Sequence, residues 1–320
     1  MTYVVLATDR VSKKGLAPVR DDERFEVHQI HDSSSDQFST VLAKAHALVV
    51  RSATKVDASV FAAAPELKVV GRAGVGVDNI DIEAASRAGV AVYNAPGGNT
   101  IAAAELTMAL ILSVVRRVTA ADRSVRAGRW DRASFRGVEL LGRTLGLIGA
   151  GRIGGEVARR CEAFGMTVMA YDPYIDESRA QQLGIRLATA DEVIEEADVI
   201  SLHVPLNDET RHLIDREAFE RMKKRVFVIN ASRGGVIVEA DLADALEEGL
   251  IAGAALDVYE DEPLSPDSPL RDAPNLVLTP HLGASTKEAQ VSVAREVALS
   301  IRTALVDGDF SGALNASGLA

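Results

Sequence analysis

Three side chains with acid–base or anion-binding chemistry follow predicted strands in the second half of the chain. They are Arg233 in NASRGG, Glu262 in LDVYEDEP and His281 in TPHLGAS. Reducing a ketone with hydride leaves an alkoxide that needs a proton, and histidine is the side chain that titrates near neutral pH. A nearby Glu262 would stabilise the imidazolium and orient the ring, while Arg233 offers a planar fork of donors that matches a carboxylate. Together they favour oxidoreduction of an α-keto or α-hydroxy acid.

Each of these residues also has a simpler interpretation. His281 follows a proline and could be a hydrogen-bonded loop histidine, and Arg233 could be an ordinary anchor. Glu262 ends an acidic run, residues 260–262, of the kind that is usually solvated. Spacing alone does not show that the three side chains meet. The other histidines have no arrangement with cysteine or aspartate that suggests a metal, so no metal is expected: His28, His31, His46, His203 and His212.

Residues 144–172 contain the parts of a phosphate-binding unit: an apolar strand, a glycine turn, a helix and a second strand. Gly149, Gly151 and Gly154 have GxGxxG spacing, which permits a tight turn, close approach of a pyrophosphate and close helix packing. Asp172 ends the second strand, where a carboxylate accepts ribose hydroxyls and repels a 2′-phosphate. A glycine-rich turn without a ligand is the alternative, but these surrounding features favour a dinucleotide site for NAD rather than NADP. The helix has apolar residues at helical spacing: Val157, Ala158, Cys161 and Phe164.

Length and charge limit the class of protein. A chain of 320 residues is longer than one typical domain, so two are expected. The net charge of −11 argues against nucleic acid or an anionic membrane as a partner, and an anionic ligand would need local arginines. No apolar run reaches the length of a membrane span, and the first residues lack the order of a signal peptide, so a cytoplasmic protein is expected. The single cysteine, Cys161, is expected to serve packing.

The first part of the chain alternates short strands with helices, which predicts an α/β domain with a parallel sheet. Polar and glycine-rich segments follow three of the strands, at Arg51–Ser52, at residues 71–76 and at residues 94–97. Ligands collect at the carboxyl ends of parallel strands, so this domain also presents a site. The expected strands are 4–7, 25–30, 48–50, 68–70 and 90–93, and the expected helices are 35–46, 58–64 and 82–88.

Residues 100–127 are rich in alanine and predict one long helix or a closely joined pair, suited to an interdomain or subunit contact. Beyond residue 172, further strands are expected at 199–202, 226–230, 253–256 and 276–278, with a helix at 239–248. A last helix, about 287–307, cannot form a domain by itself and is expected to return to the first one. The expected domains are a substrate domain, 1–98 with 285–320, and an inserted nucleotide domain, 99–284.

The motifs resemble those of the D-isomer-specific 2-hydroxyacid dehydrogenases, and within them the branch that oxidises 3-phospho-D-glycerate to 3-phosphooxypyruvate at the entry to serine biosynthesis. The resemblance implies two doubly wound parallel-sheet domains, a Rossmann NAD-binding domain inserted into a discontinuous flavodoxin-like substrate domain. It covers nearly the whole chain. The matching segments are VVRSATKV, GRAGVGVDNID, NAPGGNTIAAAE, LGLIGAGRIGGEVA, NASRGG, GAALDVYEDEP and TPHLGASTKEAQ.

The resemblance also implies residue roles. Arg233 would bind the carboxylate and carbonyl of the substrate, Glu262 would orient His281, and His281 would be the general acid and base. Substrate contacts carried over are Arg51, Arg72, Gly74, Val75, Gly76 and, from a neighbouring subunit, Arg132. Coenzyme contacts carried over are Gly149, Gly151, Arg152, Ile153, Gly154, Asp172, Val204, Ala231, Ser232, Arg233, Asp257, His281, Gly283 and Ala284.

Several possibilities stay open at this point. The substrate could instead be hydroxypyruvate, glyoxylate or another 2-keto acid, and some relatives use the same fold as NAD-sensing regulators. Longer relatives continue beyond the equivalent of Asn315 into regulatory domains, so a short form or the catalytic portion of a longer protein is expected. The resemblance also implies a homodimer or homotetramer built largely through the nucleotide domain.

Overall fold

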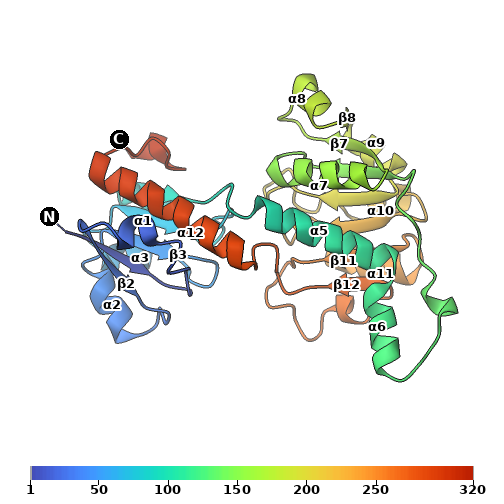
Figure 1. Ribbon diagram of the computed structural model, residues 1–320, viewed down its shortest axis with the longest axis horizontal. Helices are drawn as coiled ribbons and strands as arrows, with labels where there is room; N and C mark the ends of the chain where they lie inside the picture. The colour runs from blue at the N-terminus through green and yellow to red at the C-terminus, as the bar shows by residue number, and fades with distance from the viewer. Residues whose placement is uncertain (1, 320) are drawn as a thin grey trace. The chain divides into compact units, whose positions relative to one another are not determined.

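The computed structural model describes residues 2–319 and divides into two compact units. Unit 1 is Met1–Asn99 with Ala284–Ala320, and unit 2 is Thr100–Gly283 (Figure 1). The boundaries predicted from the sequence, 98/99 and 284/285, each lie one residue from these. Among the described residues, no helix combines the length and the apolar character needed to cross a membrane.

Unit 1 contains a parallel five-stranded sheet in the order β2-β1-β3-β4-β5, the doubly wound order typical of flavodoxin-like domains. The α/β class and the parallel sheets predicted for both domains are confirmed. The strands are β1 (Tyr3–Ala7), β2 (Phe25–Gln29), β3 (Ala47–Val50), β4 (Val69–Arg72) and β5 (Ala91–Tyr93). The helices are α1 (Ala17–Arg20), α2 (Asp36–Leu42), α3 (Ala58–Ala63), α4 (Ile82–Arg87) and α12 (Lys287–Arg302).

Alternate residues of the unit 1 strands enter two separate cores, because side chains on a strand point to opposite faces. In β1, Val5 and Ala7 face the core built with α1 and α12, whereas Val4 and Leu6 face the core built with α2, α3 and α4. Strands buried on both faces consist of nearly continuous apolar residues, which explains why they could be recognised in the sequence.

The C-terminal segment completes unit 1. Val293, Val297 and Ile301 of α12 enter the same core as β1. Further on, the side chain of Asn315 accepts a hydrogen bond from the backbone N–H of Val92 at 2.9 Å and donates one to the carbonyl of Val90 at 3.0 Å. The tail, which carries little signal in the sequence, therefore caps the edge strand β5.

Unit 2 contains a parallel seven-stranded sheet in the order β12-β11-β10-β9-β6-β7-β8. The order reverses at β6, which is the Rossmann arrangement. The strands are β6 (Thr144–Ile148), β7 (Thr167–Tyr171), β8 (Arg186–Leu187), β9 (Val199–Leu202), β10 (Phe227–Asn230), β11 (Gly253–Leu256) and β12 (Leu276–Leu278). The helices are α5 (Thr100–Val115), α6 (Val118–Arg126), α7 (Arg152–Ala163), α8 (Glu177–Gln182), α9 (Ala190–Glu196), α10 (Arg216–Arg221) and α11 (Glu239–Glu247).

Of the two forms expected for residues 100–127, the structure has the closely joined pair, because Arg117 takes a left-handed conformation with φ of 55° between α5 and α6. Two other helix predictions differ from the structure in detail. The helix predicted at residues 35–46 ends at Leu42. In the helix predicted at about 287–307, the α-helix ends at Arg302 and a π-helical turn follows. Phe164, the last of the apolar residues at helical spacing, is the C-cap of α7 and is 46% exposed. Cys161 is fully buried.

Candidate active site

Glu262 and His281 form a pair in the loops that follow β11 and β12. Oε2 of Glu262 lies 2.7 Å from Nδ1 of His281. The other carboxylate oxygen, Oε1, accepts the backbone N–H of Tyr259 at 3.2 Å. Burial by itself would raise the pKa of Glu262. The pKa nevertheless lies below its usual range, because the carboxylate accepts hydrogen bonds from His281 and the Tyr259 N–H and lies near the charges of His281 and Arg233. Glu262 is therefore ionised at neutral pH beside the imidazole.

Arg233 is presented by a tight turn at the end of β10, and its charge acts on Glu262. Asn230, the last residue of the strand, holds this turn from within. Its Oδ1 accepts the backbone N–H and the hydroxyl of Ser232, at 3.0 and 2.8 Å, and its Nδ2 donates to the carbonyl of Arg233 at 2.8 Å. The three predicted catalytic side chains thus come from adjacent strand ends of one sheet.

Asp257 is fully buried and fixes the loop that carries His281. Its carboxylate accepts the hydroxyl of Thr279 at 2.6 Å, the N–H of Leu282 at 2.7 Å and the N–H of Gly283 at 2.9 Å. These bonds hold the backbone on both sides of His281, whose φ of 53° is unusual for a residue other than glycine. Sequence reasoning placed Asp257 near the coenzyme but did not identify this supporting contact.

The glycine turn follows β6 at the same edge of the sheet. Gly149 has φ of 92°, and a Cβ there would lie 2.5 Å from the carbonyl oxygen of His203. A Cβ on Gly154 would collide with the carbonyl oxygen of Gly149, whereas one on Gly151 would meet nothing within 4 Å. The first and third glycines are therefore required by the fold. The second leaves open space before the N-terminus of α7, which begins at Arg152.

Asp172 stands at the end of β7 beside this turn. Its Oδ2 accepts the N–H of Ala150 at 2.8 Å, and its Oδ1 accepts the N–H of Tyr174 at 2.8 Å. Both bonds fix the carboxylate beside the glycine turn. Ile153, Val204, Ala231 and Ser232 are each partly exposed in the same strand-end region, and Ala284 is the first residue of the returning part of unit 1.

His203 lies under the glycine turn and was not assigned a role from the sequence. Its Nε2 is 2.9 Å from the hydroxyl of the buried Ser201. Burial lowers the pKa of His203 to about 4, so the ring is neutral at physiological pH. A polar residue directly after a buried strand, in SLHVP, is the signal that could have indicated this position.

In unit 1, the loop of residues 51–54 is held from two sides. Asp9 accepts the backbone N–H of Arg51 at 2.8 Å and that of Thr54 at 3.0 Å, and its other oxygen accepts the Thr54 hydroxyl at 2.6 Å. Asn79 donates from Nδ2 to the carbonyls of Arg51 and Thr54, at 2.7 and 2.6 Å. Neither Asp9 nor Asn79 was given a role from the sequence, although Asp9 closely follows the buried strand β1 and Asn79 lies inside the segment GRAGVGVDNID.

The other substrate contacts expected in unit 1 lie close together. The guanidinium of Arg72 covers Gly74 so tightly that any Cβ on that glycine would collide with it. Asn94 donates to the carbonyl of Val75 at 2.6 Å and so ties the loop of residues 74–76 to the next strand end. In unit 2, Arg132 is exposed and lines a small groove with Trp130 and Phe135.

No group of three or more metal-ligating side chains is present among residues 2–319. At the ends of β10, β11 and β12 the arginine, the carboxylate and the imidazole described above are brought together. They can bind an anion, hold a ring in one orientation and transfer a proton.

Residues 108–283 match the sequence model of the NAD-binding domain of D-isomer specific 2-hydroxyacid dehydrogenases. The D-3-phosphoglycerate dehydrogenase of Archaeoglobus fulgidus is 49% identical over 297 residues, which is 93% of this chain and 56% of that protein. The enzyme of the same name from Bacillus subtilis is 49% identical over 296 residues, 92% of this chain and 55% of that protein. The chain thus spans just over half the length of these curated relatives.

Solved structures agree with this match. D-lactate dehydrogenase from Aquifex aeolicus, complexed with NAD and lactic acid, superposes with a TM-score of 0.81 at 30% identity, over 96% of this chain and 97% of that one. Apo D-lactate dehydrogenase from Escherichia coli gives a TM-score of 0.84 at 27% identity, over 96% and 98%. Unit 2 is thus an NAD-binding Rossmann domain. The chain therefore belongs to the D-isomer specific 2-hydroxyacid dehydrogenase family.

Proposed function

We propose that this chain catalyses the NAD-dependent oxidation of 3-phospho-D-glycerate to 3-phosphooxypyruvate, the first step of serine biosynthesis. The observation that carries the chemistry is the contact of 2.7 Å between Glu262 and His281, beside Arg233, at the edge of the sheet that also bears the glycine turn. The observation that favours this substrate is the sequence similarity: over more than nine-tenths of its length, the chain is 49% identical to D-3-phosphoglycerate dehydrogenases.

The residues of unit 2 fit NAD. The absence of a side chain at Gly151 leaves the N-terminus of α7 open to a diphosphate, and the carboxylate of Asp172 is oriented by two backbone N–H groups. The carboxylate would repel a 2′-phosphate, which supports NAD over NADP. When bound, NAD accepts hydride from C2 of the hydroxy acid or, as NADH, returns it to the keto acid.

The proton is handled by the chain itself. Because Nδ1 of His281 faces Glu262, the opposite nitrogen, Nε2, is free to take the hydroxyl proton of the substrate during oxidation and to return it during reduction. Glu262 stabilises the imidazolium that forms, and its own bond to Tyr259 N–H prevents it from rotating away. Arg233 would bind the carboxylate and polarise the carbonyl of the substrate.

We assign the substrate phosphate to Arg51, whose backbone is held by Asp9 and Asn79. The family's smaller substrates have no phosphate for an arginine to bind. Arg72 and the backbone N–H groups of residues 74–76 would contact the carboxylate.

A substrate panel tests the proposal. The purified chain is offered 3-phosphooxypyruvate, hydroxypyruvate, glyoxylate and pyruvate, and NADH absorbance is followed. We expect the highest kcat/KM with 3-phosphooxypyruvate, and Arg51→Ala should raise its KM more than that of pyruvate. If Arg51→Ala raised the KM for both substrates equally, or if the wild type preferred an unphosphorylated keto acid, the chain would have the activity of another member of the family. If none of the four keto acids were turned over, an NAD-sensing role would be favoured. His281→Ala should lower turnover by roughly two to four orders of magnitude while NADH binding is retained.

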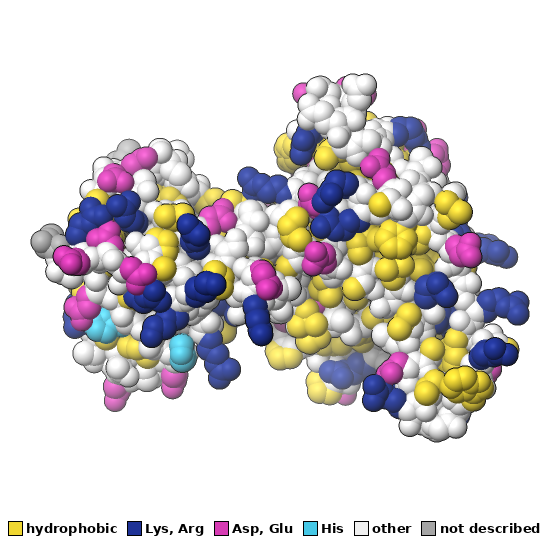
Figure 2. Space-filling view, in the orientation of Figure 1, with side chains coloured by type: hydrophobic (Ala, Val, Ile, Leu, Met, Phe, Trp, Pro, Cys, Tyr) yellow, Lys and Arg dark blue, Asp and Glu magenta, His cyan; other side chains and the backbone are white. Residues whose placement is uncertain are grey.

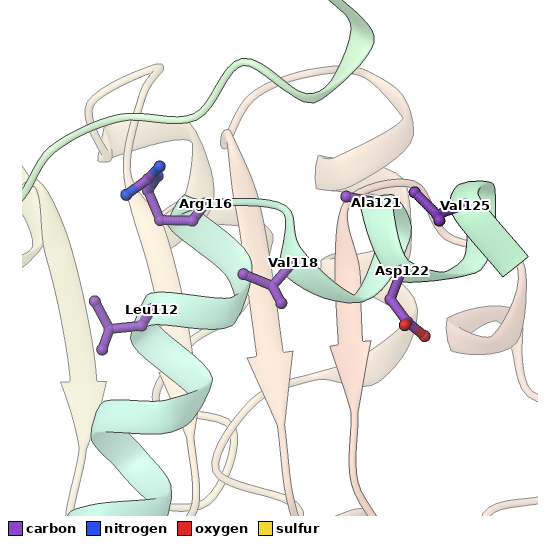
Figure 3. A pocket seen from close by; sticks show the side chains of 6 residues that line it. All are labelled: Leu112, Arg116, Val118, Ala121, Asp122 and Val125. Atoms are coloured by element: carbon purple, nitrogen blue, oxygen red, sulfur yellow. The ribbon is translucent and has the colours of Figure 1, made fainter. Parts of the chain in front are cut away.

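We also propose that the chain forms a homodimer or homotetramer through α5 and α6. A groove there is lined by Leu112 and Arg116 of α5 and by Val118, Ala121, Asp122 and Val125 of α6, and Figure 3 shows these side chains along the two helices. Val118 and Val125 are 52% and 54% exposed, and Trp130 in the following loop is 81% exposed. An apolar face of this kind is typical of a subunit contact.

Light scattering tests this contact. Val125→Asp should reduce the measured mass to that of one chain, whereas Leu299→Asp, which places the same charge on an exposed residue of unit 1, should leave it unchanged. An unchanged mass for Val125→Asp would remove this face as the contact. Arg132 would act in the oligomer, on the substrate phosphate of a neighbouring subunit, and Arg132→Ala should then raise KM for phosphorylated substrates selectively.

We place the enzyme in the cytoplasm, since its one cysteine, Cys161, is free and a chain without disulfides is in keeping with a reducing compartment. Fractionation of cells that express a tagged chain tests this location. Recovery mainly with membranes would contradict it.

A further inference from the structure

Two loops of unit 2 that carry proposed catalytic groups approach each other at the backbone. Gly234 follows Arg233 in the turn after β10, and Tyr259 lies in the loop after β11. A Cβ on Gly234 would collide with the carbonyl group of Tyr259 and would lie 2.7 Å from the backbone nitrogen of Glu260. Any side chain at position 234 would therefore push apart the loops that carry Arg233 and Glu262.

The same two loops are joined by a reciprocal pair of glutamates. Glu239, the first residue of α11, accepts the backbone N–H of Glu260 through Oε1 at 2.6 Å. In return, Oε1 of Glu260 accepts the backbone N–H of Glu239 at 3.5 Å. Val238 precedes the helix and has no side-chain acceptor for the free N–H groups of the first helical turn. Glu260 thus supplies an acceptor from another loop, and we call these contacts the Glu239–Glu260 pair.

A third segment holds the Arg233 turn from its other side. The backbone N–H of His212 donates to the carbonyl of Gly235 at 2.8 Å. Nε2 of the same histidine lies 3.9 Å from Oε1 of Glu260. The turn that presents Arg233 is therefore held by the segment of His212, and the Glu239–Glu260 pair fixes the next loop against it.

The Glu239–Glu260 pair holds negative charges together. On the face of unit 2 drawn in Figure 2, acidic side chains lie scattered among basic ones. At the pair, burial and the charges of Glu260 and Asp261 raise the pKa of Glu239, although the bond from the Glu260 N–H acts in the opposite direction. Like charges repel, so the charge of Glu239 does not join the loops. The loops are joined by its oxygen as a hydrogen-bond acceptor.

The Glu239–Glu260 pair lies next to the contacts on which the acid–base groups depend. Tyr259 directly precedes Glu260, and its backbone N–H holds the carboxylate of Glu262 at 3.2 Å. The other oxygen of that carboxylate lies 2.7 Å from Nδ1 of His281. A shift of the backbone at Glu260 would therefore be passed through one peptide to the donor that orients Glu262.

We propose that Glu239 is a positioning residue of the dehydrogenase reaction. Its carboxylate oxygen holds Glu260 against the turn of Arg233. The Glu262–His281 pair is thereby kept in place relative to the guanidinium that would bind the substrate. The inference rests on the acid–base and anion-binding roles proposed above, and it assigns Glu239 no contact with substrate or coenzyme.

Glu239→Gln and Glu239→Leu separate the oxygen from the charge. Both variants remove the charge from the same helical position, but only glutamine keeps an acceptor for the Glu260 N–H. With the keto acid that the wild type reduces fastest, Glu239→Leu should lower kcat roughly tenfold, because the acid–base groups lose their fixed place. Glu239→Gln should keep kcat within about twofold of the wild type. The Kd for NADH should be the same in all three proteins, since the glycine turn follows a different strand, β6.

Glu247→Leu is the matched control, because it makes the same substitution at an exposed position of the same helix. Its kcat should equal that of the wild type. Amide hydrogen exchange in residues 259–262 should be faster in Glu239→Leu than in the wild type, in Glu239→Gln and in Glu247→Leu. A merely structural role of Glu239 would lower Tm in Glu239→Leu and leave kcat at the wild-type value.

A double-mutant cycle shows whether Glu239 acts through Glu262. In a Glu262→Ala background there is no carboxylate to position, so Glu239→Leu should lower kcat further by less than about twofold. Equal losses in both backgrounds, or equal kcat values for Glu239→Leu and Glu239→Gln, overturn the inference. A wild type that reduces none of the four keto acids would overturn the proposed function together with this role in it. An active wild type with an equally active Glu239→Leu overturns this inference alone.

Discussion

The carboxylate of Glu262 lies between two donors, with Oε2 2.7 Å from Nδ1 of His281 and Oε1 3.2 Å from the backbone nitrogen of Tyr259. The backbone bond fixes the carboxylate, and the carboxylate fixes the imidazole. The exposed side of the ring is thereby left for substrate: the His281 side chain is 44% exposed and that of Glu262 37%.

Glu262→Gln keeps the shape of this side chain but removes the charge that favours a protonated His281. We expect kcat to fall roughly 10- to 100-fold, less than for His281→Ala. The loss should appear in both directions, because the ring takes the substrate proton in oxidation and returns it in reduction. Steady-state rates of oxidation and of reduction check this. Asp261→Asn is the neighbouring control, and a wild-type kcat for Glu262→Gln would contradict the assigned role.

Asp9→Asn tests the support of Arg51. The amide can offer only one oxygen to the two N–H groups and one hydroxyl that Asp9 binds, so at least one donor loses its partner at a local cost of about 1–3 kcal/mol. We expect amide hydrogen exchange in residues 51–54 to be faster than in the wild type. The KM for 3-phosphooxypyruvate should rise more, relative to the wild type, than the KM for pyruvate. Asp32→Asn, at an exposed turn of the same unit, is the control. Unchanged exchange would show that the loop does not depend on Asp9.

Much of this site could be predicted because its chemistry follows buried strands. The GxGxxG turn, Asp172 and the three strand-end residues of unit 2 are recognisable from apolar runs of four or five residues that stop at a polar residue. Their convergence could not be predicted from spacing, since Glu262 and His281 come from different strand connections. The contact depends on the strand order β10-β11-β12, a tertiary property.

Supporting contacts were the part that sequence patterns missed. Asp9 and Asn79 act through hydrogen bonds to the backbone of residues 51–54, and Asn230 acts on the turn that follows it. Asn79 and Asn230 lie inside recognised motifs, but their residue type alone does not distinguish these contacts from those of ordinary turn residues. The short helix α1 was missed for a similar reason, because a four-residue segment carries no periodicity. The expected pair of helices at residues 100–127 could not be divided at a particular residue, because arginine, which stands at the break, is a good helix former.

Asp172→Asn should weaken discrimination against NADP. The amide retains the size of the side chain but removes the negative charge that repels a 2′-phosphate. We expect the ratio of kcat/KM for NAD to that for NADP to fall at least about tenfold, equivalent to about 1.4 kcal/mol. Asp176→Asn, at the N-cap of α8, controls for loss of a nearby charge. A ratio that does not change would mean that the coenzyme preference comes from elsewhere in the site.

His203 predicts an acid-sensitive stability. Burial lowers its pKa to about 4, whereas the unfolded ring titrates near 6.5, so the unfolded chain binds more protons between these values. Stability must therefore fall as the pH drops through this window, by about 2 kcal/mol at about pH 5. Between about pH 7.5 and about pH 5, the Tm of the wild type should fall further than that of His203→Gln. His46, whose pKa is also lowered by burial, is present in both proteins and cancels in the comparison. If the Tm of the two proteins fell by the same amount over this pH range, His203 would be excluded as the source of the acid sensitivity.

Gly151→Ala and Gly154→Ala should separate coenzyme binding from folding. A Cβ at position 151 meets no protein atom within 4 Å, so Gly151→Ala should change the free energy of unfolding by less than about 0.5 kcal/mol. The added methyl group occupies the space before α7 that a diphosphate needs, and the Kd for NADH should rise at least tenfold, or about 1.4 kcal/mol. At position 154 the Cβ collides with the carbonyl oxygen of Gly149, which forces α7 away from β6 and should destabilise the fold by about 1–3 kcal/mol. Urea unfolding and NADH fluorescence titration measure the two effects. If Gly151→Ala binds NADH like the wild type, the diphosphate does not lie at this turn.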